Sequence, residues 1–169
     1  MSNTAIVTDS NSGITPDEAK RLGIYLVPMP FFIDGELFYE GVNLSHRDFF
    51  RRMNSGADIT TSQPTPGDVL NLWDDVLESF DALVYIPMSS ALSGSCATAS
   101  ALADDYDGRV YVVDNQRISA TQRASVLDAV DMAQAGLDAA SIAEILTREK
   151  LEASIYITVD TLKYLKKGG

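Results

Sequence analysis

Two clusters of hydroxyl side chains lie where the sequence changes from one predicted element to the next. Residues 89–95, "SSALSGS", follow the apolar run 81–88 and precede the small-residue helical run 96–106; residues 60–66, "TTSQPTP", form the second cluster. A helix start presents unpaired N–H groups and a partial positive charge, both favourable to an anion. Hydroxyls and backbone amides with few cations therefore indicate a small anionic head group, a carboxylate or a single phosphate.

Four residues are the candidate ligands of this head group. Ser93 is predicted to be the N-cap of the helix, with Gly94 in its first turn, and its hydroxyl adds a donor. Gly94 would let a ligand approach the backbone closely. Thr61 and Ser62 could donate to the same oxygens. Serine and threonine are also common before helices simply because they cap well, so either cluster alone also fits a purely structural role.

Further polar residues follow other predicted strands. Asp9 and Ser10 follow the strand 5–8, Ser90 belongs to the first hydroxyl cluster, and Asp114 follows the strand "VYVV". Ligands of open α/β sheets bind beyond the carboxyl ends of the strands, so these four residues are accessory candidates. Asp9 at a strand end also fits an aspartyl-phosphate phosphatase, although Asn11 stands where a second carboxylate for magnesium would be wanted.

Composition disfavours several other kinds of chemistry. The net charge of −11 disfavours nucleic acid and permanent residence on an anionic membrane. The only histidine, His46, leaves little choice for a metal site or a Ser-His-Asp triad, and the only cysteine, Cys96, excludes an internal disulfide. We expect no metal and no cofactor. The absence of a leader and of an apolar run of about 18 residues favours a cytoplasmic protein without stable membrane insertion.

The elements that must position these residues alternate between strand and helix. Thr15, Ser45 and Thr65 precede three of the predicted helices. Pro28 and Pro30 favour an extended edge segment over 24–33, and the following Asp34-Gly35 turn predicts a hairpin. Short strands are predicted at 5–8, 81–87, 108–114 and 152–159. This order predicts an α/β fold: a mostly parallel sheet with helices on both faces, in three layers.

Five segments together resemble the DegV family of bacterial fatty-acid-binding proteins: "VTDSNSGI", "TTSQPTPGD", "IPMSSALSGSCATA", "VYVVDNQRIS" and "DTLKYLKKGG". The resemblance runs from residue 6 to residue 169. It implies that Thr61 and Ser93 hold the carboxylate of a long-chain fatty acid, with the backbone of Gly94 beside it. It also implies that the protein presents this acid to a fatty-acid kinase, without supplying chemistry of its own.

The resemblance carries two further expectations. Family members continue for roughly another domain, so residues 1–158 are expected to form the fatty-acid-binding domain and residues 159–169 to begin the helix that leads into a second domain absent from this chain. The family pattern Ser-x-Gly-x-Gly corresponds here to Ser119, Thr121 and Arg123, which makes Ser119 another accessory candidate and predicts that Thr121 and Arg123 fill space that glycines would leave open.

Three hypotheses remain at this point. The first is a non-enzymatic carrier of long-chain fatty acids. The second is a small phosphatase or phosphotransferase that uses Asp9. The third is a truncated assembly module that does not bind lipid, whose open face forms a dimer or contacts another chain.

Overall fold

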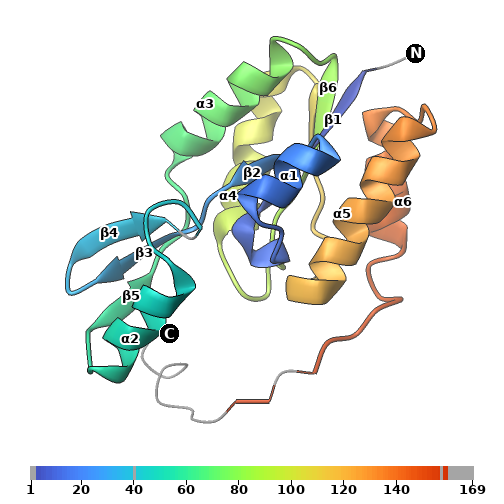
Figure 1. Ribbon diagram of the computed structural model, residues 1–169. Helices are drawn as coiled ribbons and strands as arrows, with labels where there is room; N and C mark the ends of the chain where they lie inside the picture. Colours follow the sequence, from blue (N-terminus) through green and yellow to red (C-terminus); the bar gives the residue numbers. More distant parts are fainter. Residues whose placement is uncertain (1–2, 40, 157, 160–169) are drawn as a thin grey trace.

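A parallel sheet forms the centre of the protein. The computed structural model describes residues 3–39, 41–156 and 158–159. Its main sheet has four strands in the order β2-β1-β6-β7, all parallel. Figure 1 labels β2, β1 and β6 of this sheet. The strands are β1 (Thr4–Asp9), β2 (Tyr25–Val27), β6 (Ala82–Ile86) and β7 (Val110–Val112). The two inner strands are almost entirely buried, as the continuous apolar runs at these positions require.

Helices cover both faces of this sheet, so the predicted three-layer α/β fold is confirmed. One face packs against α1 (Pro16–Leu22), α5 (Ser119–Gln134) and α6 (Ala139–Arg148). The other packs against α3 (Pro66–Leu77) and α4 (Ser95–Ala103). Successive strand residues point to opposite faces of the sheet. Val84 belongs to the core on the side of α1, α5 and α6, and Tyr85 to the core on the side of α3 and α4, where the centre of its ring lies 5.7 Å from that of Trp73.

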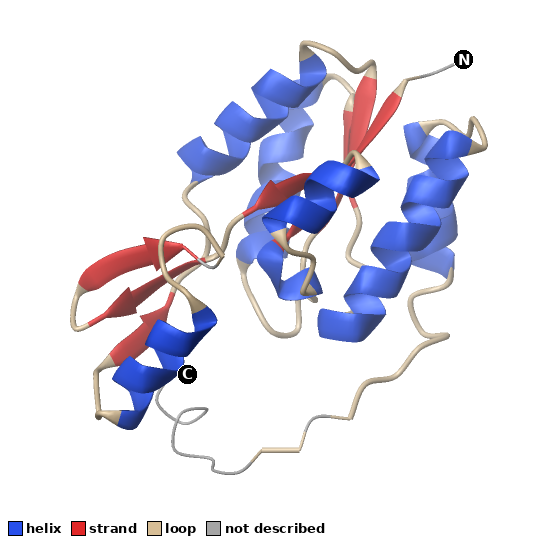
Figure 2. Ribbon diagram, in the orientation of Figure 1, coloured by secondary structure: helices blue, strands red, loops and turns tan. Residues whose placement is uncertain are grey.

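A second, smaller sheet lies beside the main one (Figure 2). It is antiparallel, with the order β4-β3-β5, and α2 (His46–Asn54) accompanies it. Its strands are β3 (Pro30–Ile33), β4 (Glu36–Tyr39) and β5 (Ile59–Thr61). The predicted hairpin is present, and both turn residues, Asp34 and Gly35, have positive φ. Strand β5 was not predicted: Thr60 and Thr61 lie in a strand instead of a loop.

Local capping explains where several elements begin. The hydroxyls of Thr15, Ser45 and Thr65 each accept a hydrogen bond from the backbone N–H three residues on, as predicted. Two short 3-10 helices complete the described structure, η1 (Ser10–Ser12) and η2 (Asp104–Tyr106). Within the part of the chain that is described, no helix is both long and apolar enough to cross a membrane.

The C-terminal expectations had different outcomes. The strand predicted at 152–159 is wrong for the residues described there, which have no regular secondary structure; Ile155 and Tyr156 are 39% and 95% exposed. The helix expected to start within 159–169 lies, apart from Val159, outside the described residues. The boundary at residue 158 stays a prediction.

Candidate functional site

A cavity of about 640 Å³ lies between the small sheet and the loops at the carboxyl ends of β1 and β6. Its lining is mainly apolar. The β3 strand contributes Phe31, and α2 contributes Phe49 and Phe50. The rings of Phe31 and Phe49 meet edge to face at 5.5 Å, and those of Phe49 and Phe50 at 5.4 Å. These three rings, called the aromatic wall below, form a surface suited to an apolar ligand.

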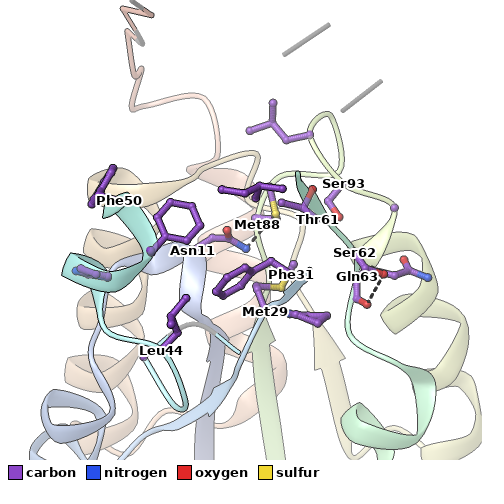
Figure 3. Close-up of a pocket in the computed structure, with 17 residues that line it drawn as sticks. Asn11, Met29, Phe31, Leu44, Phe50, Thr61, Ser62, Gln63, Met88 and Ser93 are labelled. Atoms are coloured by element: carbon purple, nitrogen blue, oxygen red, sulfur yellow. Dashed lines mark hydrogen bonds between the residues drawn. The ribbon is translucent and has the colours of Figure 1, made fainter. Parts of the chain in front are cut away.

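The four candidate head-group ligands all line this cavity. Thr61, Ser62 and Ser93 gather on one side of it, opposite Leu44 and Phe50 (Figure 3). Gly94 lies next to Ser93 in the same lining. Residues that are far apart in the sequence therefore line one cavity, with these hydroxyl groups across from Leu44 and Phe50.

The small sheet positions Thr61 and Ser62. Thr61 is the last residue of β5 and pairs with Phe31 of β3, so a hydroxyl stands beside the aromatic wall. The backbone N–H of Ser62 donates to the carbonyl of Pro30 at 3.2 Å, which extends the pairing by one residue. The Ser62 hydroxyl donates to the Gln63 carbonyl at 3.2 Å. Both hydroxyls are thus held at the edge of a hydrogen-bonded strand.

The loop before α4 positions Ser93 and Gly94. The Ser93 N–H donates to the carbonyl of Ser89 at 3.2 Å, which closes the turn. The predicted capping is displaced by one residue: the N-cap position is Gly94 and the helix begins at Ser95. The Ser93 hydroxyl still accepts from the Ser95 N–H at 3.2 Å. Since an oxygen that accepts one bond keeps its own O–H to donate, this hydroxyl remains able to bind an anion.

Sequence reasoning missed Gln63, which joins the two sides of the site. Its side-chain oxygen accepts a hydrogen bond from the Thr98 hydroxyl of α4 at 3.3 Å, and it lies 3.6 Å from where a Cβ on Gly94 would stand. Gln63 directly follows the paired hydroxyls in "TTSQP", which was the available signal. The aromatic wall was missed as well, because its members come from separate elements that only the tertiary fold brings together.

Asp9 lies behind the cavity and does not line it. Its side chain is 0% exposed. One carboxylate oxygen accepts from the Asn11 N–H and from Gln122 Nε2, each at 3.0 Å, and the other accepts from the Met88 N–H at 2.8 Å. Burial nevertheless raises the pKa of Asp9, because these bonds only partly offset its desolvation.

The other accessory candidates also lie outside the lining. Ser90 donates its hydroxyl to Asp114 at 2.5 Å and its N–H to the other carboxylate oxygen at 3.2 Å, so this pair fixes the loop. The Ser10 hydroxyl accepts from the Met29 N–H at 3.1 Å. Ser119 is exposed at the first position of α5, with φ of 54°.

Thr121 and Arg123, which were expected to fill space that glycines would leave open, do not line the cavity. The Thr121 hydroxyl donates to the carbonyl of Ile118 at 2.9 Å. Arg123 forms a bidentate ion pair with Glu18 of α1, and this hydrogen bonding lowers the pKa of Glu18. Thr121 thus bonds within the first turn of α5, Arg123 ties α5 to α1, and neither side chain lines the cavity.

The single histidine, the single cysteine and the acidic residues do not form a metal-binding group among the described residues. His46 lines the cavity at the start of α2. Cys96 is 3% exposed in α4, and burial raises the pKa of its thiol to about 11. Among the described residues, no group of three or more His, Cys, Asp or Glu side chains could hold a metal ion.

Comparison with known proteins gives a consistent result. A family model described as an uncharacterised protein of the DegV family matches residues 3–169. A DegV domain-containing protein of Deinococcus radiodurans is 35% identical over 98% of this chain and 59% of its own length. One from Caldanaerobacter subterraneus is 31% identical over 100% of this chain and 61% of its own length. The chain thus spans about three fifths of these relatives.

Solved structures agree with this result. A fatty-acid-binding DegV family protein from Thermus thermophilus is 30% identical, with a TM-score of 0.86 over 99% of this chain and 60% of its own. DegV of Bacillus subtilis, described as a fatty acid binding protein, is 27% identical with a TM-score of 0.86 over 100% of this chain and 61% of its own. With this fold and a family match over nearly its whole length, the chain belongs to the DegV family.

Proposed function

We propose that this protein binds a long-chain fatty acid in the cavity beside the small sheet. The carboxylate is held by the hydroxyls of Thr61 and Ser93, by the Ser62 hydroxyl once it turns from the Gln63 carbonyl to which it donates, and by the backbone at Gly94. The acyl chain lies along the aromatic wall. One observation carries the proposal: the four residues expected to bind an anion line one otherwise mainly apolar cavity. The fatty-acid-binding descriptions of the Thermus and Bacillus relatives support it.

The physics of the cavity favours an amphiphile over a small anion. Burial of each methylene contributes about 0.8 kcal/mol, so a long acyl chain supplies most of the binding free energy. Hydroxyl and amide donors supply orientation, because a hydrogen bond to a charged group is worth about 1.5–3 kcal/mol. A free phosphate or a short carboxylate would gain only the second contribution.

Gly94 gives independent support. Its φ of −68° is ordinary for any residue, and a Cβ there would meet only Gln63 Oε1, at 3.6 Å. Neither the backbone conformation nor the packing of the protein requires glycine at this position. Close approach of a ligand to the backbone would explain why residue 94 is a glycine.

The role we propose is that of a carrier without catalysis of its own, which presents the carboxylate to a fatty-acid kinase. An exposed rim supports presentation: Phe50 and Leu92 are 53% and 56% exposed where they line the cavity. The Asp9 phosphatase hypothesis gains no support, because the Asp9 carboxylate is fully buried and all its hydrogen bonds go to groups of the protein. The lipid-free assembly module and the dimer stay predictions.

The first experiment is organic extraction of the gently purified protein, followed by mass spectrometry. We expect stoichiometric long-chain fatty acid from the wild type and strong depletion in Ser93→Ala. Ser100→Ala is the matched control, because Ser100 lies on α4 with its hydroxyl bonded to the Cys96 carbonyl and does not line the cavity. A wild-type extract without lipid, together with no binding of added stearate, would reject the proposed function.

A further inference from the structure

A buried carboxylate supports one wall of the cavity from behind. Asp9 accepts hydrogen bonds from the backbone N–H groups of Asn11 and Met88, and both of these residues line the cavity. The two are also joined to each other, since Asn11 Nδ2 donates to the Met88 sulfur at 3.1 Å. Met88 begins the segment that leads through the hydroxyl cluster to Ser93. A single side chain thus sets the position of two lining residues and of the loop that carries a candidate ligand.

The Asp9 carboxylate also accepts a hydrogen bond from helix α5, which covers one face of the main sheet. Gln122 of α5 is 0% exposed, and its Nε2 donates to Asp9, to the Thr8 hydroxyl at 3.2 Å and to the carbonyl of Ile86 at 3.1 Å. Thr8 in turn donates to the Ile86 carbonyl at 2.7 Å. Asp9 is the member of this network that also reaches the cavity wall.

We propose that Asp9 is a positioning residue for the lipid site, and that its ionised form holds the cavity wall in the shape that binds the acid. This proposal rests on the proposed function. When the carboxylate gains a proton, it loses acceptor capacity towards three donors that converge on it, and the Met88 and Asn11 amides lose their strong partner. Lipid binding is therefore linked to a proton: affinity falls as Asp9 becomes neutral.

The surroundings of Asp9 contain little that would compete with this titration. The Tyr85 phenol on β6 and the Cys96 thiol on α4, which both respond to the charge of Asp9, are uncharged at and below neutral pH. Asp114, which also acts on Cys96, accepts hydrogen bonds from Ser90. The nearest cation on α5, Arg123, is paired with Glu18. Because burial raises the pKa of Asp9 above its ordinary value of 3.8, the carboxylate gains its proton in milder acid than an exposed aspartate does.

The first test needs neither a lipid nor a variant. In an NMR pH titration of the lipid-free protein, the Met88 and Asn11 amide resonances should shift with one midpoint, the same as that of the Asp9 carboxyl carbon, and above 3.8. Amide resonances that follow another group, or that do not move while Asp9 titrates, would overturn the positioning role. This readout is independent of whether the protein binds fatty acids.

The second test compares lipid affinity in Asp9→Asn and Thr8→Val. The probe is dodecanesulfonate, whose head group stays ionised throughout, so that any pH dependence belongs to the protein. In Asp9→Asn an amide NH₂ group replaces one acceptor oxygen, and we expect about tenfold weaker binding at neutral pH and a flat pH profile. Thr8→Val disturbs the same buried network without a link to the lining, and should keep the wild-type affinity and profile.

The outcomes separate the two proposals. If the wild type binds neither dodecanesulfonate nor stearate at any pH, the proposed function fails, while the amide titration still decides whether Asp9 holds the wall. If the wild type binds both and its affinity for the sulfonate does not change as Asp9 titrates, the linkage fails and the fatty-acid site stands. Equal losses in Asp9→Asn and Thr8→Val would assign Asp9 to stability alone.

Discussion

Gly94→Ala should make the protein more stable and a weaker lipid binder. The backbone of Gly94 is helical, with φ of −68° and ψ of −9°, and the Ser93 hydroxyl already accepts the Ser95 N–H, so an alanine methyl fits without loss of a cap. Its Cβ would stand in ordinary contact with Gln63 Oε1 at 3.6 Å. A glycine replaced by alanine in a compatible conformation gains about 0.4–1 kcal/mol of stability, because the unfolded chain loses freedom.

The same methyl would stand where the carboxylate approaches the backbone. Loss of one hydrogen bond to the charged head group costs about 1.5–3 kcal/mol, which corresponds to roughly 10-fold to 150-fold in Kd. Urea unfolding of the lipid-free protein measures the first effect, and calorimetric titration with a series of fatty acids of increasing length measures the second. The loss should be the same for every chain length, since the methyl acts on the head group alone.

Two results would refute this reasoning. Unchanged affinity would show that the ligand does not approach Gly94. A loss that grows with acyl length would place the methyl against the tail instead of the carboxylate. Ser100→Ala again provides a control, because it alters a hydroxyl of α4 that bonds to the Cys96 carbonyl and does not line the cavity.

Three further predictions concern the aromatic wall, the thiol and acid stability. Phe31→Ala removes ring contacts with Phe38 and Phe49 worth about 0.5–1.5 kcal/mol each, and should lower both the melting temperature and the affinity for stearate. Phe80→Ala is the control: it loses one ring contact with Tyr25 away from this cavity and should lower only the melting temperature. Cys96, 3% exposed with its pKa raised to about 11, should resist a disulfide reagent at neutral pH until the protein unfolds; rapid reaction in the folded state would contradict its burial. Arg123 lowers the pKa of Glu18, so the stability that this pair contributes is present above pH 4.5, the ordinary pKa of a glutamate, and is lost as the pH falls through the lowered pKa. Glu18→Gln should therefore make the free energy of unfolding depend less on pH in acid. The same pH dependence in variant and wild type would show that the pair contributes nothing measurable.

The main layers of the fold were predictable because their signals are local. Apolar runs such as 81–87 mark strands buried on both faces, and capping residues such as Thr15 and Ser45 mark helix starts. Pro28 and Pro30 predicted the position of one strand in its sheet correctly and that of another wrongly. Pro28 directly follows β2, which is an edge strand as expected, but β3 lies in the middle of the small sheet with Pro30 as its first residue.

Strand pairing explains the errors. Residues 59–61 form a strand because β3 offers them an edge. Their β-branched side chains suit a strand, but the polar, proline-containing run 60–66 to which two of them belong is typical of a loop. The segment 152–159 has a more strand-like sequence, yet its described residues are not paired with a strand, and Tyr156 is 95% exposed. A short segment becomes a strand only when a distant partner is available, and that information is not local.

The same distinction applies to the site. The hydroxyl residues could be named from two compact motifs, and the structure brings Thr61, Ser62, Ser93 and Gly94 into one cavity. The contacts that support them could not be predicted, although Asp9 and Ser90 were among the candidates. The bond from Thr98 to Gln63 joins α4 to the segment after β5, and the roles of Asp9 and Ser90 behind the lining depend on hydrogen bonds that only the folded chain reveals.

The division of the cavity between two sheets has an evolutionary consequence. The aromatic wall belongs entirely to the segment 30–61, which carries β3, β4, α2 and β5, whereas Ser93 and Gly94 belong to a loop of the parallel sheet. In the proposed site, substitutions of the three rings would reshape the surface that meets the acyl chain, while Thr61 at the end of this segment and the loop with Ser93 and Gly94 keep the head-group contacts. Under the proposed function, preference for the acyl chain can therefore diverge without loss of carboxylate binding, and exchange of residues 30–60 between two homologues, with Thr61 kept, should transfer chain preference as a unit.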